Sequence, residues 1–325
     1  MSRKLKERRF ETTAASSSIL LPVKEIYTLA DLRELRHEKL RPPIRLGVFG
    51  KPVAHSRSPQ MQNAALKKCD VEMRYTRFEI EPAELRAALE ILPELDFAGV
   101  NLTVPHKIAA LQLVDEADEN ARQIGAVNTI KIEGGKLRGF NTDGKGFSRA
   151  IREEFSVDLR DLRVLVLGAG GAARAIALQC AKEKCERLVI VNRDFEKAKQ
   201  LSDELRPFFA GPKVLGPVAR LQAVASEEAA LQFQIANVDL VVNATSLGLN
   251  RADALPIPAR LLAPHLMVYD TVYPSGQTAF VGAAVEAGAR AANGLSMLLH
   301  QGALAFEIWF DRPAPLGTMR KALGP

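Results

Sequence analysis

The sequence predicts an α/β protein with two domains, each built on a mostly parallel sheet covered by helices. The first observation is that short apolar strands alternate with amphipathic helices along most of the chain. The second is the length of 325 residues, which is typical of two domains. The third is the polar stretch Ser156–Arg163, after which the alternation starts again, so we expect the boundary between the domains there.

The first domain is expected to span residues 44–156, after an N-terminal arm of residues 1–43. In the arm, Thr28–Lys39 is expected to be an added helix, because Leu29, Leu32 and Leu35 recur at helical spacing after Thr28, an N-cap residue. The patterns then predict, in order, a strand Ile44–Phe49, a helix Pro59–Lys68, a strand Met73–Ile80, a helix Pro82–Leu92, a strand Ala98–Leu102, a helix His106–Asp115, a hairpin of Val127–Ile132 and Lys136–Phe140 around Gly134-Gly135, and a helix Gly144–Phe155.

The second domain is expected to span residues 157–290. Its predicted strands are Arg163–Leu167, Arg187–Val191, Lys213–Leu215, Leu240–Asn243 and Met267–Thr271, and its predicted helices are Gly171–Glu183 and Phe195–Leu205. Two further helices, Ser296–Phe310 and Gly317–Leu323, lie in residues 291–325, after the second sheet is complete. We therefore expect these C-terminal helices to pack back on the first domain.

Composition excludes several classes of protein. Hydrophobic residues make up 47% and charged residues 25% of the chain, which is typical of a globular protein and not of a disordered, collagen-like or membrane protein. No apolar run approaches the roughly 18 residues that span a bilayer, so no membrane partner is expected. Cys69, Cys180 and Cys185 form neither a CxxC pair nor a disulfide framework, which favours a cytoplasmic location.

Much of the net charge of +6 comes from the first nine residues, which carry five cations, Arg3, Lys4, Lys6, Arg8 and Arg9, and one acid, Glu7. The body of the chain has no cluster of Lys and Arg with interleaved aromatic residues, so no nucleic-acid partner is expected. Two interpretations of the basic arm stay open. One is an organelle transit peptide, against which the acids Glu7 and Glu11 count, and the other is a disordered or partner-contacting arm.

A glycine-rich turn follows the first strand of the second domain. Gly168 permits a tight turn, Gly170 lets a pyrophosphate approach the backbone, and Ala173 keeps the next helix close to the sheet. Free N–H groups at the start of that helix would bind phosphate. The turn predicts a C-terminal Rossmann dinucleotide-binding domain, and the alternative is a purely structural tight turn.

The second strand of this domain ends at Asn192-Arg193, about 25 residues after Gly168, where such enzymes read the ribose of the cofactor. An acid here binds a free 2′-hydroxyl, whereas an arginine binds a 2′-phosphate, so Arg193 favours NADP. Asp194 and Glu196 would repel that phosphate, which leaves NAD possible. A merely solvated Arg193 is the remaining alternative.

Four small polar clusters end strands of the first domain, where open parallel sheets bind ligands. They would suit a ligand rich in hydroxyl groups, which makes this the N-terminal substrate domain. The clusters are residues 55–59 (HSRSP), 101–107 (NLTVPHK), 126–129 (AVNT) and 141–144 (NTDG).

In this order, and followed by GAGGAARA, the clusters resemble the shikimate dehydrogenase family, including its quinate/shikimate dehydrogenase relatives. The resemblance runs from about Leu46 to the C-terminus, with later matches at residues 192–193 (NR), 243–248 (NATSLG), 270–274 (DTVYP) and 294–302 (GLSMLLHQG). It implies the reversible, NADPH-dependent reduction of 3-dehydroshikimate to shikimate in chorismate and aromatic amino-acid biosynthesis, by a monomer or a homodimer.

The same resemblance implies roles for individual residues. Lys107 and Asp143 would be the catalytic pair and would also contact the substrate. The carboxylate would be bound at Ser56 and Ser58, with Thr103 and Tyr273 nearby, and the ring hydroxyls by Asn128, Asp143 and Gln301. The cofactor would be bound by Gly168, Ala169, Gly170, Gly171, Ala172, Asn192, Arg193, Lys197, Ala244, Thr245, Thr271 and Gly294.

The chemistry of a ketone reduction also fits Lys107. Hydride transfer to a carbonyl leaves a developing alkoxide, which needs a nearby proton and a positive charge. A lysine is protonated at neutral pH, and Asp143 would hold it in place. No metal is required, and the five histidines show no ligand spacing.

Simpler structural roles stay open for the same side chains. Lys107 could be a solvated residue at the start of a helix, Asp143 a helix cap, and Ser56 and Ser58 hydroxyls of a local turn. His55 and His106 are expected to be structural, and Met297 and Leu298 to be core residues.

Two other functions compete with the first. One is a quinate/shikimate dehydrogenase with NAD or dual cofactor use, and the other is a non-catalytic binding or regulatory homologue. The sequence departs from the family at two positions. Gln62 stands where the family often has His, but this position faces no proposed chemistry. Asp194 stands where NADP-specific members often have Thr or Ser, and it favours dual or NAD use.

Overall fold

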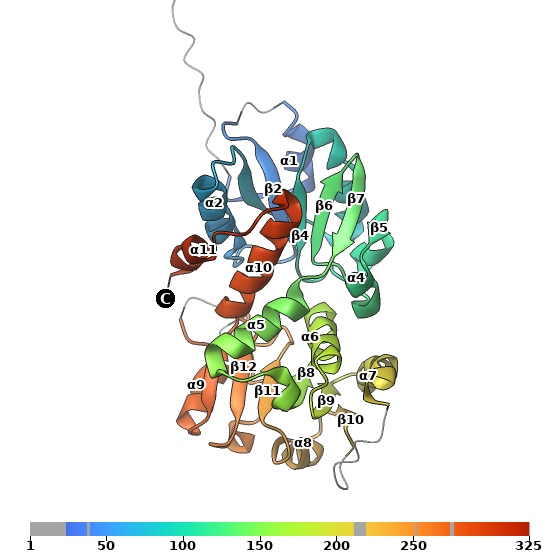
Figure 1. The fold of residues 1–325 in the computed structure, drawn as a ribbon, viewed down its shortest axis with the longest axis vertical. Helices are drawn as coiled ribbons and strands as arrows, with labels where there is room; N and C mark the ends of the chain where they lie inside the picture. The colour runs from blue at the N-terminus through green and yellow to red at the C-terminus, as the bar shows by residue number, and fades with distance from the viewer. Residues whose placement is uncertain (1–23, 38–39, 211–218, 251, 274–275, 325) are drawn as a thin grey trace, which may run out of the picture.

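The computed structural model describes residues 24–37, 40–210, 219–250, 252–273 and 276–324. Figure 1 shows two α/β bodies stacked along the long axis of the molecule, each with its own sheet. One sheet has seven strands and the other has six. The predicted α/β class with two sheets is therefore confirmed, while the domain boundaries in residue numbers stay a prediction.

The first sheet has the strand order β1-β3-β2-β4-β6-β7-β5. The first four of these strands run parallel, β6 runs antiparallel to β4, and β6 and β7 form the predicted hairpin, with positive φ angles at Gly134 and Gly135. The strands are β1 (Ile26–Tyr27), β2 (Ile44–Gly50), β3 (Arg74–Glu79), β4 (Gly99–Leu102), β5 (Glu116–Ala117), β6 (Thr129–Glu133) and β7 (Lys136–Phe140). The accompanying helices are α1 (Leu29–Glu34), α2 (Ser58–Lys68), α3 (Leu85–Glu90), α4 (Glu119–Ile124) and α5 (Asp143–Phe155).

The second sheet is parallel throughout, with the order β10-β9-β8-β11-β12-β13. Its central strands are apolar and fully buried, as expected when helices cover both faces. The strands are β8 (Arg163–Leu167), β9 (Arg187–Asn192), β10 (Leu221–Ala225), β11 (Leu240–Asn243), β12 (Met267–Asp270) and β13 (Arg290–Asn293). The helices are α6 (Gly171–Lys182), α7 (Phe195–Phe209), α8 (Glu228–Ile235) and α9 (Ala279–Glu286).

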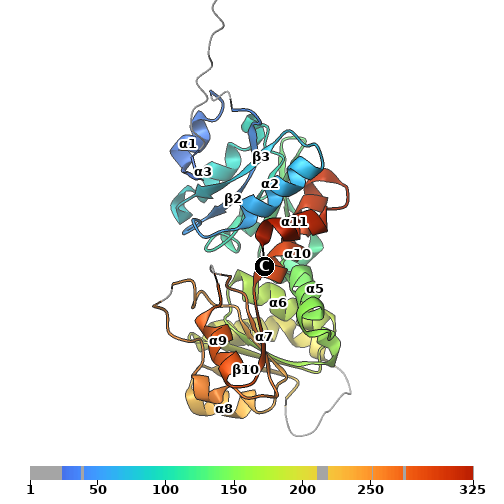
Figure 2. The same ribbon diagram turned by 90° about the vertical axis from the view of Figure 1, so that its left-hand side faces the viewer.

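The last two helices, α10 (Leu295–Phe310) and α11 (Leu316–Leu323), pack on the first domain as predicted. Figure 2 shows α11 beside α2. Side chains of α2, α10 and α11 share one hydrophobic core with side chains of β2. The indole of Trp309 on α10 donates to the carbonyl oxygen of Ile130 at 2.9 Å. An added Cβ on Gly99 would lie 2.1 Å from the indole nitrogen, so the sheet needs glycine there.

The predicted helix His106–Asp115 is wrong. Only a 3-10 turn, Ala109–Gln112, forms in this segment. The ring of His106 is buried and its Nε2 lies 2.9 Å from the Ile80 carbonyl oxygen, while the Lys107 carbonyl accepts from the Val127 N–H at 2.8 Å. The Lys107 carbonyl is thereby taken from the Leu111 N–H that a helix would pair with it, and that N–H bonds to the Ile108 carbonyl in a tighter turn instead.

Some elements differ from the predictions, and two predictions fall on residues outside the described ranges. The added helix forms after its Thr28 cap but ends at Glu34. The predicted strand Lys213–Leu215 lies outside the described residues, and the described edge strand is β10. The basic residues 1–23 also lie outside them, so both interpretations of the arm stay open. Strands β1, β5, β10 and β13 and helices α4, α8 and α9 were missed.

Within the described part of the chain, no helix is long and apolar enough to cross a membrane.

Candidate active site

Several of the predicted site residues lie just after the carboxyl ends of parallel strands. Ser56 and Ser58 follow β2, Thr103 and Lys107 follow β4, and the glycine turn follows β8. The two domains meet at these loops. An added Cβ on Gly171, at the start of α6, would lie 3.0 Å from the Cβ of Lys107. The nucleotide turn and the predicted catalytic lysine are thus adjacent in space.

Lys107 and Asp143 form a close ion pair. The lysine Nζ lies 2.5 Å from Oδ2 of Asp143, and the two side chains are 15% and 4% exposed. No helix begins at Lys107, so its alternative as a solvated helix-start residue is wrong. Asp143 is the first residue of α5, and its backbone N–H is bound by the Asn141 side chain at 3.0 Å. Its carboxylate is therefore available to Lys107 rather than used as a cap.

Asn128 fixes the other carboxylate oxygen of Asp143. Its Nδ2 donates to Oδ1 of Asp143 at 2.8 Å, while its Oδ1 accepts from the Thr142 N–H at 2.9 Å. The amide orientation is thereby defined. Nδ2 also lies 3.5 Å from Oε1 of Gln301, whose own amide nitrogen donates to the Leu298 carbonyl at 2.8 Å. Lys107 after β4, Asn128 before β6, Asp143 on α5 and Gln301 on α10 therefore converge, with both donors and acceptors for ring hydroxyls.

The two serines lie at the other end of this group, together with Tyr273. The Ser56 side chain hydrogen-bonds Tyr273, and burial together with the charge of Asp143 raises the pKa of Tyr273 to about 12. Tyr273 therefore keeps its proton and can donate to an anion. Ser58 N–H lies 3.4 Å from Ser56 Oγ, so a local turn bond is present, but no side chain caps α2. Thr103 packs beside them, its methyl group filling the space next to Gly50.

Sequence reasoning missed a buried polar network behind these residues. The Tyr75 hydroxyl donates to Oδ1 of Asn101 at 2.8 Å, and Nδ2 of Asn101 donates to Oγ1 of Thr129 at 3.0 Å. Thr129 in turn donates to Oδ1 of Asn128 at 2.9 Å. Asn101 and Thr129 stand in the polar clusters and could have been found there, whereas Tyr75 lies inside a strand with no signal of its own.

The cofactor turn has the backbone that its glycines imply. Gly168 has φ +114°, and a Cβ there would lie 2.9 Å from the Ala244 carbonyl oxygen. A Cβ on Gly170 would meet nothing within 4 Å, and no side chain caps α6. The first N–H groups of α6 are thus open to a phosphate, as the predicted nucleotide site requires. This end of the second domain fits a bound dinucleotide.

Other predicted cofactor residues follow β11, β12 and β13, at the same carboxyl edge of the second sheet. Ala244 touches Gly168, and Thr245 hydrogen-bonds Oδ1 of Asn243 at 2.7 Å. A Cβ on Gly294 would lie 2.2 Å from the Thr271 carbonyl oxygen, so these two are in contact. Ala169 and Ala172 flank Gly170 and Gly171 in the turn.

Arg193 lies exposed just after β9, at the edge of the predicted ribose site. The neighbouring Asp194 carboxylate pairs with Lys197 at 3.3 Å, and the Asn192 side chain donates to the Asp194 backbone at 2.9 Å. Lys197 therefore offsets the acidic charge that would oppose a 2′-phosphate beside Arg193.

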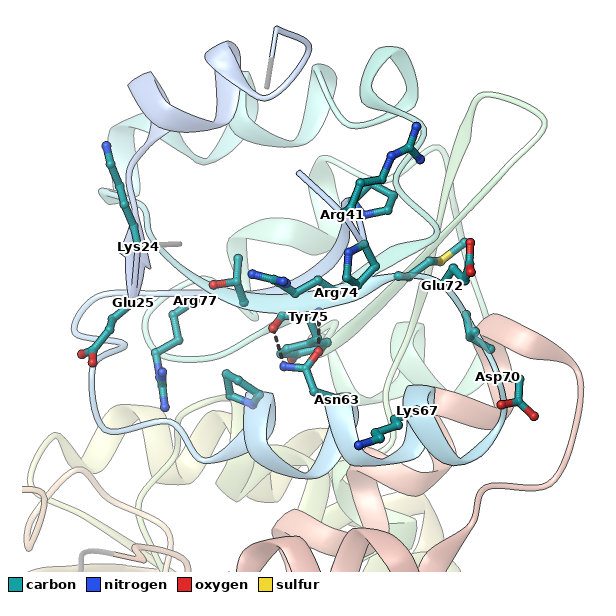
Figure 3. A pocket seen from close by; sticks show the side chains of 16 residues that line it. Lys24, Glu25, Arg41, Asn63, Lys67, Asp70, Glu72, Arg74, Tyr75 and Arg77 are labelled. Atoms are coloured by element: carbon teal, nitrogen blue, oxygen red, sulfur yellow. Dashed lines mark hydrogen bonds between the residues drawn. The ribbon is translucent and has the colours of Figure 1, made fainter. Parts of the chain in front are cut away.

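A separate pocket lies away from these residues, between α2 and the outer edge of β3 (Figure 3). It has a volume of about 910 Å³, and no predicted site residue lines it. Asn63 covers the strand edge there, because its side chain accepts from the Tyr75 N–H at 2.9 Å and donates to the Tyr75 carbonyl at 2.8 Å. In the same described segments, no three His, Cys, Asp or Glu side chains gather as a metal site.

Three protein-family models match the chain. The model described as "Shikimate dehydrogenase substrate binding domain" matches residues 48–130, which include Lys107. "Shikimate / quinate 5-dehydrogenase" matches residues 149–249, which include Gly168, and "Shikimate 5'-dehydrogenase C-terminal domain" matches residues 294–323.

Individual proteins resemble the chain over most of its length. The shikimate dehydrogenase (NADP(+)) of Methanopyrus kandleri is 40% identical over 280 residues, which cover 86% of this chain and 94% of that protein. The solved structure of shikimate 5-dehydrogenase from Thermus thermophilus, in complex with NADP(H) and shikimate, is 36% identical with a TM-score of 0.73, over 86% of this chain and 98% of that one. Quinate dehydrogenase from Corynebacterium glutamicum, in complex with NAD, is 30% identical with a TM-score of 0.74, over the same shares.

Proposed function

The chain belongs to the shikimate dehydrogenase family, and we propose that it catalyses the reversible NADPH-dependent reduction of 3-dehydroshikimate to shikimate with Lys107 and Asp143 as its catalytic pair. The observation that carries the proposal is the buried ion pair of these residues, 2.5 Å apart, directly beside the nucleotide turn. A proton donor, a cofactor turn and a set of hydroxyl-binding amides meet at one place.

Lys107 serves the reacting oxygen. When NADPH is bound, its nicotinamide supplies a hydride to the carbonyl carbon. Lys107 stabilises the negative charge that grows on the carbonyl oxygen and gives that oxygen a proton from Nζ. In the reverse direction the same nitrogen takes the hydroxyl proton. Asp143 holds Nζ in place, and its carboxylate stabilises the positive charge of Lys107 whenever Nζ carries the proton.

The other predicted residues orient the substrate. Asn128 and Gln301 would bind the ring hydroxyls. The amide of Asn128 contacts both Asp143 and Gln301, so the three side chains border the same space. Ser56, Ser58 and Tyr273 would donate to the carboxylate at the other end.

The nucleotide turn would hold NADP. The open N–H groups of α6 would bind the pyrophosphate, and Arg193 would bind the 2′-phosphate. Thr271 and Gly294 would border the nicotinamide, next to each other at the ends of β12 and β13.

A quinate/shikimate dehydrogenase with NAD or dual cofactor use is the second candidate. Asp194 beside Arg193 and the likeness to the NAD-bound quinate dehydrogenase favour it. The complete catalytic pair counts against the non-catalytic homologue. The cytoplasmic location, the absence of a nucleic-acid partner and the choice between monomer and homodimer stay predictions.

A spectrophotometric assay tests the proposal. Reduction of NADP or NAD is followed with shikimate or quinate, in all four combinations. We expect turnover with shikimate and NADP, and Lys107→Ala should abolish it while shikimate binding, measured by calorimetry, largely survives. Lys131→Ala is the matched control, because Lys131 is 14% exposed and pairs with Asp311 outside the site. No turnover in any combination, or full activity of Lys107→Ala, would contradict the proposal.

A further inference from the structure

Arg77 on β3 lies directly behind the serine end of the site, the end that carries Ser56 and Ser58. Its Nε and Nη2 both donate to the carbonyl oxygen of Ser56, at 2.9 and 2.7 Å. Figure 3 shows the side chain reaching from the strand toward the start of α2. Two donors on one acceptor fix the backbone of Ser56, and with it the turn that carries Ser58.

The charge of Arg77 has no acidic partner in the described segments. No carboxylate there lies within ion-pair distance of its guanidinium, which otherwise meets only the Gln60 side chain. Its positive charge lowers the pKa of both Tyr75 and Tyr273, although burial raises these pKa values overall. The field of Arg77 therefore reaches the groups that line the serine end.

The two ends of the site differ in charge as a result. At one end Lys107 is neutralised by Asp143, so no net charge remains there. At the other end Arg77 is partly buried and unpaired, and among the described residues the neighbouring Arg57 binds only the Leu323 carbonyl oxygen. A partly buried cation without a partner favours an anion nearby, because water screens the two charges less than at the surface.

We propose that Arg77 is a positioning and specificity residue, which holds Ser56 in place and supplies the positive charge that makes the site prefer a carboxylate to a neutral substituent. The inference rests on the proposed function, because that function places the substrate carboxylate at Ser56 and Ser58. Arg77 acts through Ser56 and through its field. It takes no part in proton transfer at Lys107.

Steady-state kinetics with two substrates test this role. Shikimate carries the carboxylate, and its methyl ester has the same ring without the charge. In Arg77→Gln we expect the KM for shikimate to rise about tenfold or more, while kcat changes less than about threefold and the KM for NADP is unchanged. The KM for the ester should rise less than that for shikimate, because the uncharged ester has no electrostatic attraction to Arg77 that the substitution could remove.

Two further variants separate charge from structure. Arg77→Lys keeps the charge but not the two-donor contact, so its preference for shikimate over the ester, as a ratio of kcat/KM values, should stay close to that of the wild type. Arg74→Gln is the matched control, since Arg74 is a partly exposed arginine at the start of the same strand. It should leave all constants unchanged.

Turnover of shikimate by the wild-type protein tests the proposed function first, and the variants then test Arg77 alone. An unchanged KM for shikimate in Arg77→Gln would overturn the inference, as would an equal rise for shikimate and its ester. If Arg77→Gln does not fold, Arg77→Lys decides, and a lost preference for shikimate in that variant overturns it.

Discussion

Replacing Asp143 by Asn is the sharpest test of the catalytic pair. The two side chains have almost the same shape, so packing around this buried position is unchanged. In the protein each carboxylate oxygen receives a donor, Oδ2 from Lys107 at 2.5 Å and Oδ1 from Asn128 at 2.8 Å. An amide offers only one oxygen. Whichever way it is turned, its NH₂ group faces either an ammonium or another amide donor.

The size of the effect follows from these contacts. A hydrogen bond to a charged group contributes about 1.5–3 kcal/mol, and a donor left facing another donor costs about 1–3 kcal/mol. Their sum is roughly 3 kcal/mol or more at the position of Lys107, which corresponds to a loss of about 100-fold or more in kcat. The KM for NADP should stay unchanged, because Asp143 does not line the nucleotide turn.

The assay is initial-rate kinetics of shikimate oxidation with NADP, together with thermal unfolding to show that the variant is folded. Asp311→Asn is the control, since it removes the nearer of two carboxylate partners of Lys131, whose 14% exposure matches the 15% of Lys107. The control should keep wild-type rates. A kcat for Asp143→Asn within about threefold of the wild type would refute the reasoning, because the geometry allows no compensating orientation of the amide.

Three other changes have defined outcomes. Burial lowers the pKa of His106, so the unfolded chain binds a proton at this residue more readily than the folded chain does. The free energy of unfolding should therefore fall as the pH drops below about 6.5. His106→Gln keeps a donor for the Ile80 carbonyl but does not titrate, so its melting temperature should fall less than that of the wild type as the pH is lowered from 7.5 to 5. The same pH dependence of the melting temperature in both proteins would contradict this prediction. Gly168→Ala forces a Cβ against the Ala244 carbonyl at φ +114°, which should cost about 1–3 kcal/mol of stability and weaken NADP binding in a titration. Unaltered NADP affinity would show that the turn does not hold the cofactor. Arg193→Ala should raise the KM for NADP about tenfold and leave the KM for NAD unchanged, and a parallel rise of both would exclude a contact with the 2′-phosphate.

Much of the fold could be predicted because the signals are local. The strands β2, β8, β9 and β11 are apolar runs between helices, and each was placed within a residue or two. The helix at His106–Asp115 failed for the opposite reason. His106 bonds to Ile80 and Lys107 bonds to Val127, and neither partner is near in sequence. Apolar spacing alone does not reveal such competing bonds.

Part of the candidate site could likewise be predicted from local sequence, and part depends on contacts between distant segments. The sequence by itself determined the glycine turn, since Gly168 needs a positive φ that its neighbours already imply, and it put Lys107 and Asp143 in recognisable clusters. Only the tertiary structure decided that these two side chains lie 2.5 Å apart and that Arg77 binds the Ser56 carbonyl with no acidic partner among the described residues. A backbone conformation is set by a few adjacent residues. The charge at a site is set by side chains from distant strands, and their distances exist only once the sheets have packed.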